Sequence, residues 1–383
     1  MNGDASAVFF GKFASYATYE RKNKQPHSSV TRLIQLLTSG RRGNDMEGTV
    51  IYTTQTELSE MDRGMAKLFK MPLKNVEDNV DTERGAQAEL LQGPYQVPEF
   101  KASALKCGAG VNLSQNNPAY QKIHRLYLMA AFAVVSGRLS EIASKTTGGH
   151  AIGAILVKKD GTIAGWSTNS NKRNKSQHAE VNLIQSYFAR PGITQLPSGS
   201  FIYSTLKPCL MCAGMIVSCA GDAYRVIYGQ DDSGDLASNT ALDQSGHSEL
   251  IGSGISGQLH LVNANFQTKG TKGGRLAMQA PGQAKLPPEK DKPPRGKVNV
   301  AETLDTAYRA RPRDSGGLTG YLSDWGGHGS GVIGSVADRL AGKIGKTDQY
   351  YKTKYGDDTA ILAVIRHIEA YLKDVGLFTS MNW

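Results

Sequence analysis

Two short segments constrain this chain more than any other feature: H-A-E at 178–180 and P-C-L-M-C at 208–212. Cys209 and Cys212 stand three positions apart, a spacing that puts two side chains on one face of a helix. His178 adds an imidazole from another element. A catalytic zinc site has three protein ligands and one open position. We therefore expect His178, Cys209 and Cys212 to hold one zinc ion (Zn2+).

The residues around these ligands suit that chemistry. Pro208 is typical of the first turn of a helix, and the positive end of a helix favours thiolate over thiol at Cys209 and Cys212. Glu180 lies two positions after His178, so within a regular helix the two do not share a face. At a first turn it can still reach a water on the metal, and we expect it to move protons rather than bind zinc.

A metal and a carboxylate arranged in this way predict hydrolytic removal of an aromatic amine. Zinc lowers the pKa of its bound water from 15.7 to about 7, so hydroxide is present at neutral pH. That zinc-bound hydroxide would add to C4 of cytosine or C6 of adenine. Glu180 would take the water proton, protonate the ring nitrogen and later protonate the departing ammonia.

Two other interpretations of the cysteines stay open. The C-x-x-C pair could be a redox pair, although H-A-E would then have no role. A structural zinc would require a fourth ligand, and no well-placed candidate is evident. Cys219 is interpreted as a buried core thiol rather than a ligand.

Around this motif, helical and extended patterns alternate, which predicts an α/β fold with a mostly parallel sheet. A K-D-G turn at 159–161 joins the first two strands as a hairpin. The spacing before the last strand leaves room for a crossover helix, so the final strand pair is expected to be parallel. Strands are predicted at 151–157, 162–168, 200–205, 224–229 and 258–262, and helices at 120–144, 178–189, 208–219 and 235–242.

The flanking regions differ in composition. Residues 268–297 are rich in Gly, Pro and Lys and are expected to be a flexible basic linker. Residues 298–383 are expected to form a small helical C-terminal module, with its best helix at 359–375. The catalytic domain is placed at 119–267 and an N-terminal domain at 1–105.

The N-terminal domain carries a weak internal repeat. An ungapped shift of 151 positions aligns GTVIYTT (48–54) with GSFIYST (199–205) and His27 with His178. At the same shift, Ser29, Leu58 and Met61 stand where the second copy has Glu180, Cys209 and Cys212. We interpret 1–105 as a degenerate, metal-free copy of the catalytic domain, with chance similarity as the alternative.

Residues 119–263 resemble the cytidine deaminase-like superfamily, whose zinc enzymes share the H-x-E…P-C-x-x-C pattern. PCLMCAGMI (208–216) is similar to the tRNA adenosine deaminase and nucleic-acid-editing branch, and the whole chain resembles a Bdellovibrio-type bacterial deaminase family. The resemblance implies a three-layer α-β-α fold with a five-stranded mixed sheet whose last strand is parallel. It also implies that Asn169 contacts the base or sugar and that the Ala179 N–H binds the base carbonyl.

Charge and composition bear on partners and location. The net charge is +10, and Lys172, Arg173 and Lys175 precede His178, so phosphate contacts with single-stranded DNA or RNA, tRNA among them, are expected. Free nucleosides or nucleotides are the alternative substrates, and a nucleic-acid-binding protein with structural zinc is the non-enzymatic alternative. With no signal-peptide pattern, no long apolar run and four cysteines, we expect a cytoplasmic protein without a membrane partner. We expect a monomer in which the N-terminal copy and the catalytic domain form an internal pseudo-dimer.

Overall fold

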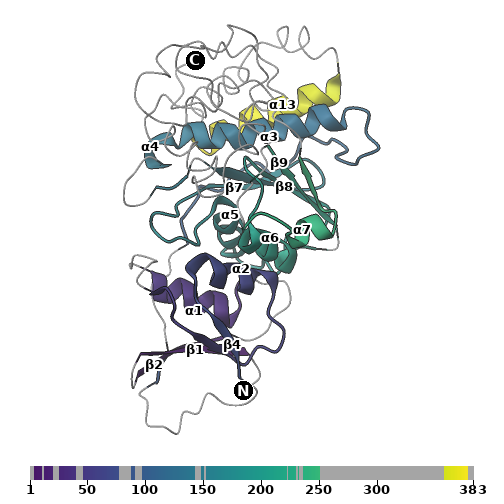
Figure 1. Cartoon of the computed structure of the whole chain (residues 1–383). Coiled ribbons are helices and arrows are strands. Elements are labelled where there is room, and N and C mark those ends of the chain that lie inside the picture. Colours follow the sequence, from purple (N-terminus) through teal and green to yellow (C-terminus); the bar gives the residue numbers. More distant parts are fainter. Residues whose placement is uncertain are drawn as a thin grey trace, which may run out of the picture.

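The structure is a computed structural model in which two five-stranded sheets lie at opposite sides of a stack of helices (Figure 1). We call residues 4–90 the first unit, and residues 97–250 with 358–377 the second unit. The described residues are 4–10, 13–19, 26–39, 46–76, 88–90, 97–142, 148–150, 152–221, 223–229, 232, 236–250 and 358–377.

The sheet of the second unit has the order β10-β9-β8-β6-β7. Strands β8, β9 and β10 are parallel, and β6 pairs antiparallel with both β8 and β7. The strands are β6 (Gly153–Val157), β7 (Ile163–Thr168), β8 (Ser200–Ser204), β9 (Tyr224–Tyr228) and β10 (Ser248–Leu250). The helices are α3 (Tyr120–Gly137), α4 (Leu139–Ile142), α5 (Ala179–Phe188), α6 (Leu210–Cys219), α7 (Ala241–Gln244) and α13 (Thr359–Asp374).

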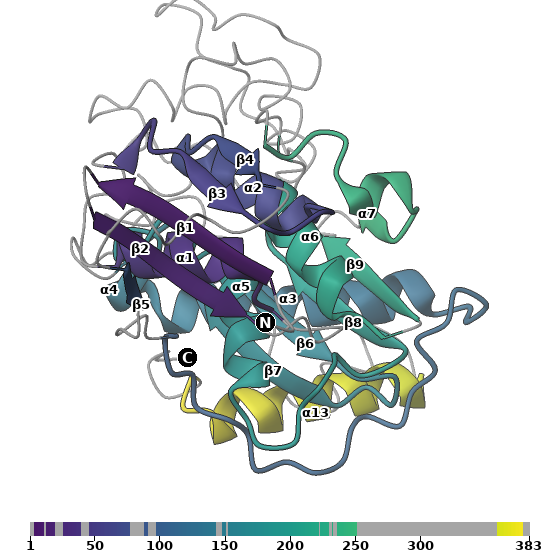
Figure 2. The same ribbon diagram turned by 90° about the horizontal axis from the view of Figure 1, so that it is seen from below.

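Every residue of β6 and of β8 is buried, as expected for central strands that are covered on both faces. On β6, Ile155 and Val157 face α3 and α13, whereas Ala154 and Leu156 face α5 and α6. The sheet thus forms the middle layer of an α-β-α arrangement. Figure 2 shows the same arrangement from below, with α13 beside β7 and α3.

The hairpin between β6 and β7 follows from its turn residues. Gly161 has a positive φ of 82°, and the Gly161 N–H donates to Lys158 O at 2.9 Å. A side chain at this φ would be strained, so glycine suits the position. The predicted K-D-G turn is confirmed.

The first unit has a smaller sheet with the order β4-β3-β1-β2-β5. Its helices lie between its own sheet and helices α5 and α6 of the second unit (Figure 1). The elements are β1 (Asp4–Phe10), β2 (Phe13–Tyr19), α1 (Ser29–Thr38), β3 (Ile51–Thr53), α2 (Glu60–Phe69), β4 (Leu73–Asn75) and β5 (Ala88–Leu90).

Helix α13 comes from the far end of the chain but belongs to the core of the second unit. Asp358 caps it by accepting from the backbone N–H groups of Ala360 and Ile361. Its apolar face packs on α3. The buried His367 Nε2 accepts a hydrogen bond from the Ile163 N–H of β7 at 3.1 Å.

The α/β prediction and the five-stranded mixed sheet with a parallel last strand are confirmed. The sheet is not mostly parallel, because two of its strand pairs are parallel and two are antiparallel. The last strand, which pairs with β9, is β10 at Ser248–Leu250. The strand predicted at 258–262 lies outside the described residues. The predicted helix around 235–242 is shorter and later, at Ala241–Gln244. The predicted linker and most of the predicted C-terminal module also lie outside the described residues. Among the described helices, none is long and apolar enough to cross a membrane.

Candidate metal centre and active site

The candidate metal ligands lie at the N-termini of two neighbouring helices. His178 is the N-cap of α5, and Cys209 is the N-cap of α6. Cys212 is the third residue of α6. The helix begins at Leu210, so Pro208 precedes it rather than opening it, contrary to the prediction. The backbone N–H groups of a first helical turn stabilise negative charge, and both thiols lie at that end.

The three side chains converge on one point. The Cys209 and Cys212 sulfurs are 3.6 Å apart, and His178 Nδ1 lies 3.6 Å and 3.5 Å from them respectively. In the described part of the chain this is the only His/Cys/Asp/Glu group of three or more whose donor atoms converge in this way. One imidazole and two thiols are a donor set that suits zinc, and three ligands leave the open position that a catalytic site requires.

The protonation of the cluster also suits a cation. The hydrogen bond between the two thiols, together with the adjacent His178, holds the pKa of Cys209 well below its usual range. Burial raises the pKa of Cys212, as does the charge on Cys209 beside it. Burial alone would lower the pKa of His178, but the neighbouring Cys209 thiolate raises it. The cluster therefore retains protons that a bound metal would displace.

Glu180 lies beside the cluster without being part of it. It is in the first turn of α5 and only 3% exposed. The Ser204 hydroxyl, at the end of β8, donates to Glu180 Oε1 at 2.6 Å. Burial raises the pKa of this carboxyl group. A raised pKa makes the carboxylate a stronger base than a solvent-exposed one, which suits an acid–base role.

Asn169 directly follows β7 and carries an unsatisfied buried amide. The residue is 2% exposed, and neither its Oδ1 nor its Nδ2 has a hydrogen-bond partner. Buried amides in proteins are nearly always paired, so this one has the character of a ligand contact. Ala179 is the first residue of α5 and fully buried. Its backbone N–H has no partner within the helix because it belongs to the first turn.

The predicted basic segment forms the loop between β7 and α5. Lys172 and Arg173 are exposed and Lys175 is half-buried. A hydrogen bond joins the two ends of the loop, because the Ser170 N–H donates to Gln177 O at 2.9 Å. The basic loop therefore leads directly into His178.

Sequence reasoning missed two residues that support this site. Ser204 holds Glu180, and its only signal was its place at the end of a predicted strand. Asn174 stands inside the basic segment, but it is 5% exposed and its Nδ2 donates to Thr38 Oγ1 of the first unit at 3.0 Å. The first unit thus anchors the basic loop.

Fold and site together define a class: the chain carries a deaminase domain of the cytidine deaminase-like superfamily. The family model that matches, over residues 144–252, is that of the Bd3614-like deaminases.

Individual relatives cover limited parts of the chain. A cytosine deaminase from Candida albicans (strain SC5314 / ATCC MYA-2876) is 33% identical over 76 residues, which are 19% of this chain and 49% of that protein. The chain therefore spans about half the length of this curated relative.

Solved structures of deaminases also match the chain. One, from studies of A-to-I editing by tRNA:A34 deaminases at the wobble position of transfer RNA, has 32% identity and a TM-score of 0.21, covering 24% of this chain and 63% of that one. Another is a diaminohydroxyphosphoribosylaminopyrimidine deaminase/5-amino-6-(5-phosphoribosylamino)uracil reductase from Thermotoga maritima. It has 18% identity and a TM-score of 0.27, covering 35% and 37% of the two chains.

Proposed function

We propose that this protein is a zinc-dependent hydrolytic deaminase that acts on cytosine or adenine in single-stranded nucleic acid. The observation that carries the proposal is the buried Glu180 carboxyl group, held by Ser204 at 2.6 Å beside three converging metal donors. A structural zinc site has no use for such a group. His178, Cys209 and Cys212 would hold the metal, which lowers the pKa of a bound water to about 7.

The chain's own residues account for the proton movements. Hydrolysis forms a C–O bond at the ring carbon and breaks its C–N bond, so that water and the base become the oxo-base and ammonia. Glu180 accepts a proton from the attacking water and passes it to the adjacent ring nitrogen. A second proton then reaches the leaving amine through the same carboxyl group. Ser204 keeps Glu180 Oε1 oriented during these transfers.

Two further groups would position the base. The unpaired amide of Asn169 supplies one donor and one acceptor, and the edge of a base or sugar can satisfy both. The Ala179 N–H is aligned with the positive end of α5 and suits a carbonyl oxygen. Both groups are buried, so they would hold the reacting base rather than the rest of a strand.

A polynucleotide is the preferred substrate because of the basic loop. Lys172 and Arg173 are exposed on the segment that leads directly into His178. Cations at the mouth of a base pocket would contact phosphates beside a base turned into it. The net charge of +10 favours the same partner.

A free base is the second candidate, since the curated relative from Candida albicans is a cytosine deaminase. To distinguish the two, purified protein is incubated with single-stranded DNA, single-stranded RNA, free cytosine, cytidine and adenosine. Products are analysed by mass spectrometry for uracil, uridine, hypoxanthine and inosine. Turnover of strands supports the proposal, whereas turnover of free bases or nucleosides alone would replace it with the second candidate.

Glu180→Gln tests the mechanism, because glutamine keeps the shape and removes the titrating group. We expect zinc content to stay at one per chain while turnover falls by about 10²–10⁴-fold. Normal turnover in this variant would mean that another residue moves the protons. Loss of zinc would mean that Glu180 is a ligand.

A charge-matched pair of variants tests the strand contacts. Lys172→Gln/Arg173→Gln should weaken strand binding and reduce its dependence on salt, because phosphate contacts release counterions. Lys122→Gln/Arg125→Gln removes the same charge from exposed positions on α3, across the sheet, and serves as the control. Equal effects of the two pairs would show that net charge, not the loop, governs binding.

A further inference from the structure

The two units are built from the same sequence of elements. In the first unit a hairpin (β1, β2) is followed by α1, β3, α2 and β4, and in the second a hairpin (β6, β7) is followed by α5, β8, α6 and β9. The strand neighbours also agree in direction. Strand β3 is antiparallel to β1 and parallel to β4, just as β8 is antiparallel to β6 and parallel to β9. The match therefore extends over four strands and two helices.

The helices of the two units begin at equivalent residues. Ser28 caps α1 and His178 caps α5, a difference of 150 positions. Ser59 caps α2 and Cys209 caps α6, again 150 positions apart. The same offset aligns M-x-x-G-M at 61–65 with M-x-x-G-M at 211–215.

The two units also face each other through equivalent surfaces. A Cβ added to Gly64 would meet the backbone of Met211, and one added to Gly214 would meet the backbone of Met61. At the 150-residue offset Gly64 corresponds to Gly214 and Met61 to Met211, so the two contacts are equivalent to each other. Two units are related by a two-fold axis when residue i of the first contacts residue j of the second and the equivalent residues contact each other in the opposite sense.

A second pair of equivalent residues lies on that axis. Gln185 Nε2 of α5 donates to Gln35 Oε1 of α1 at 3.2 Å, and the two residues are 150 positions apart. Both side chains are buried. Helices α2 and α6 pack along one another, and α1 and α5 meet beside them (Figure 2).

At the place of the metal, the first unit has a buried carboxylate. Asp62 is the third residue of α2, as Cys212 is of α6, and it is fully buried. Its Oδ2 accepts from Ser59 Oγ and from Gln55 Nε2, both at 2.7 Å, and Ser28 Oγ donates to its Oδ1. Ser28, Ser59 and Asp62 thus converge in the first unit as the three candidate ligands do in the second.

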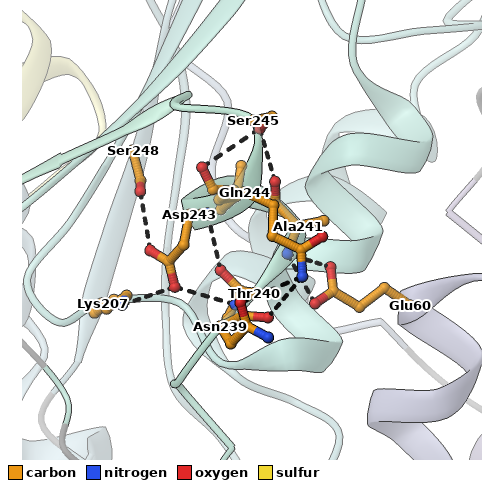
Figure 3. A network of polar contacts seen from close by, with 10 residues as sticks. Glu60, Lys207, Asn239, Thr240, Ala241, Asp243, Gln244, Ser245 and Ser248 are labelled. Atoms are coloured by element: carbon orange, nitrogen blue, oxygen red, sulfur yellow. Dashed lines mark hydrogen bonds and ion pairs between the residues drawn. The ribbon is translucent and has the colours of Figure 1, made fainter.

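The first unit also reaches toward the candidate site. Glu60, the first residue of α2, places both carboxylate oxygens 2.8 Å from the Ala241 N–H of α7 (Figure 3). Asp243 of the same short helix forms an ion pair at 2.9 Å with Lys207, which lies two residues before Cys209. The network therefore connects α2 to the segment that leads into the metal ligands.

We propose that residues 4–76 are a metal-free second copy of the deaminase unit, retained as a built-in partner that holds α6 and its ligands in place. In this copy, a hydrogen-bonded cluster of Ser28, Ser59 and Asp62 has replaced His-Cys-Cys. Val30, the second residue of α1, stands where Glu180 does, so the copy lacks the proton-transfer group as well. The proposal rests on the proposed function, because zinc bound by the second unit is the internal reference for the number of zinc ions per chain.

Restoring the ligands tests the proposed register. We expect the full-length variant Ser28→His/Ser59→Cys/Asp62→Cys to bind two zinc ions per chain by native mass spectrometry, against one for the unmodified protein. The matched control, Leu58→Cys/Met61→Cys with the natural His27, follows the ungapped 151-residue shift and should stay at one. One zinc in a folded triple variant would overturn the copy, as would two in the control. No zinc in the unmodified protein would instead contradict the proposed function.

A measurement on the unmodified protein covers the case in which the triple variant fails to fold. In a crystal structure, the first unit is superposed on the second by the backbone of the two hairpins and two helices. We expect the Cα atoms of Ser28, Ser59 and Asp62 to coincide with those of the three ligands. A better fit for residues one position away would overturn the proposal. The full chain should also be monomeric in solution, and pairing of two chains through α6 would overturn the built-in partner.

Discussion

A methyl group added at Gly64 would clash with the backbone of α6, the helix that carries the proposed metal ligands. In the Gly64→Ala variant, the new Cβ would lie 2.7 Å from Met211 Cα and 2.8 Å from Leu210 C, and closer still to Met211 N. The first distance is 0.7 Å short of the 3.4 Å at which ordinary contacts begin. Backbone atoms cannot rotate away as side chains do, so α2 and α6 would have to separate.

The expected change in the free energy of unfolding is opposite in sign to the change that the same substitution causes in an isolated helix. In an isolated helix, Gly→Ala stabilises by about 1 kcal/mol. Overpacking in a core costs about 1–3 kcal/mol, and a clash with backbone belongs at the upper end. The net expectation is a loss of about 2 kcal/mol, or roughly 4–8 °C in Tm for a folded region of this size.

Thermal unfolding followed by circular dichroism measures the loss. Zinc content is measured in parallel, because Met211 lies between the two proposed cysteine ligands. Lys67→Ala, an exposed position in the same helix, is the control and should change the stability by less than about 0.5 kcal/mol. An unchanged or raised Tm in Gly64→Ala would refute the close packing of α2 on α6.

Three other expectations follow from single contacts. Ser204→Ala removes the hydrogen bond to Glu180 and should lower kcat by about 10–100-fold with zinc content unchanged, since such bonds to charged groups contribute about 1.5–3 kcal/mol. Burial lowers the pKa of His124 to about 4, against 6.5 when unfolded, so the unfolded chain binds more protons at acidic pH and stability falls as the pH is lowered. His124 should contribute about 2 kcal/mol to the loss of stability between pH 7 and pH 5, so denaturant unfolding of His124→Gln should show a loss smaller by that amount than the unmodified protein. Glu60→Ala removes the acceptor of the Ala241 N–H, so hydrogen exchange at that amide should accelerate, whereas unchanged exchange would show that the contact does not order α7.

The elements between residues 120 and 229 could be predicted because their signals are local. Alternation of apolar residues, the K-D-G turn and the spacing of the cysteines each act over a few residues. The convergence of His178 with Cys209 and Cys212 could be expected for a different reason. Thiols at this spacing, with a histidine before them, have few uses other than metal binding.

The alignment of the two units could be predicted only in part, because a single shift cannot represent a repeat with compensating changes in length. One segment runs from the first residue of α1 to Ile51 of β3, and its equivalent runs from the first residue of α5 to Ile202 of β8. The segment of the second unit is one residue longer. From that strand to the next helix the second unit is one residue shorter. Strand β3 therefore agrees with β8 at 151 positions, whereas the helices agree at 150, which is why the sequence suggested Met61 rather than Asp62 opposite Cys212.

Contacts between distant parts of the chain were not predictable from sequence. The bond from Ser204 to Glu180 depends on how β8 ends beside α5. The contact from Asn174 to Thr38 depends on the docking of the first unit. Neither residue type carries a pattern that identifies its partner.

The position of α13 has a consequence for how the chain can change in length. The helix closes the α3 face of the second unit with Ile361, Ile368 and Leu372, although the preceding described residue is Leu250. Leu250 and Asp358 therefore lie on one folded body although they are far apart in the sequence. A chain truncated before Asp358 would lack a core helix, and the apolar surface of α3 would be left open to water.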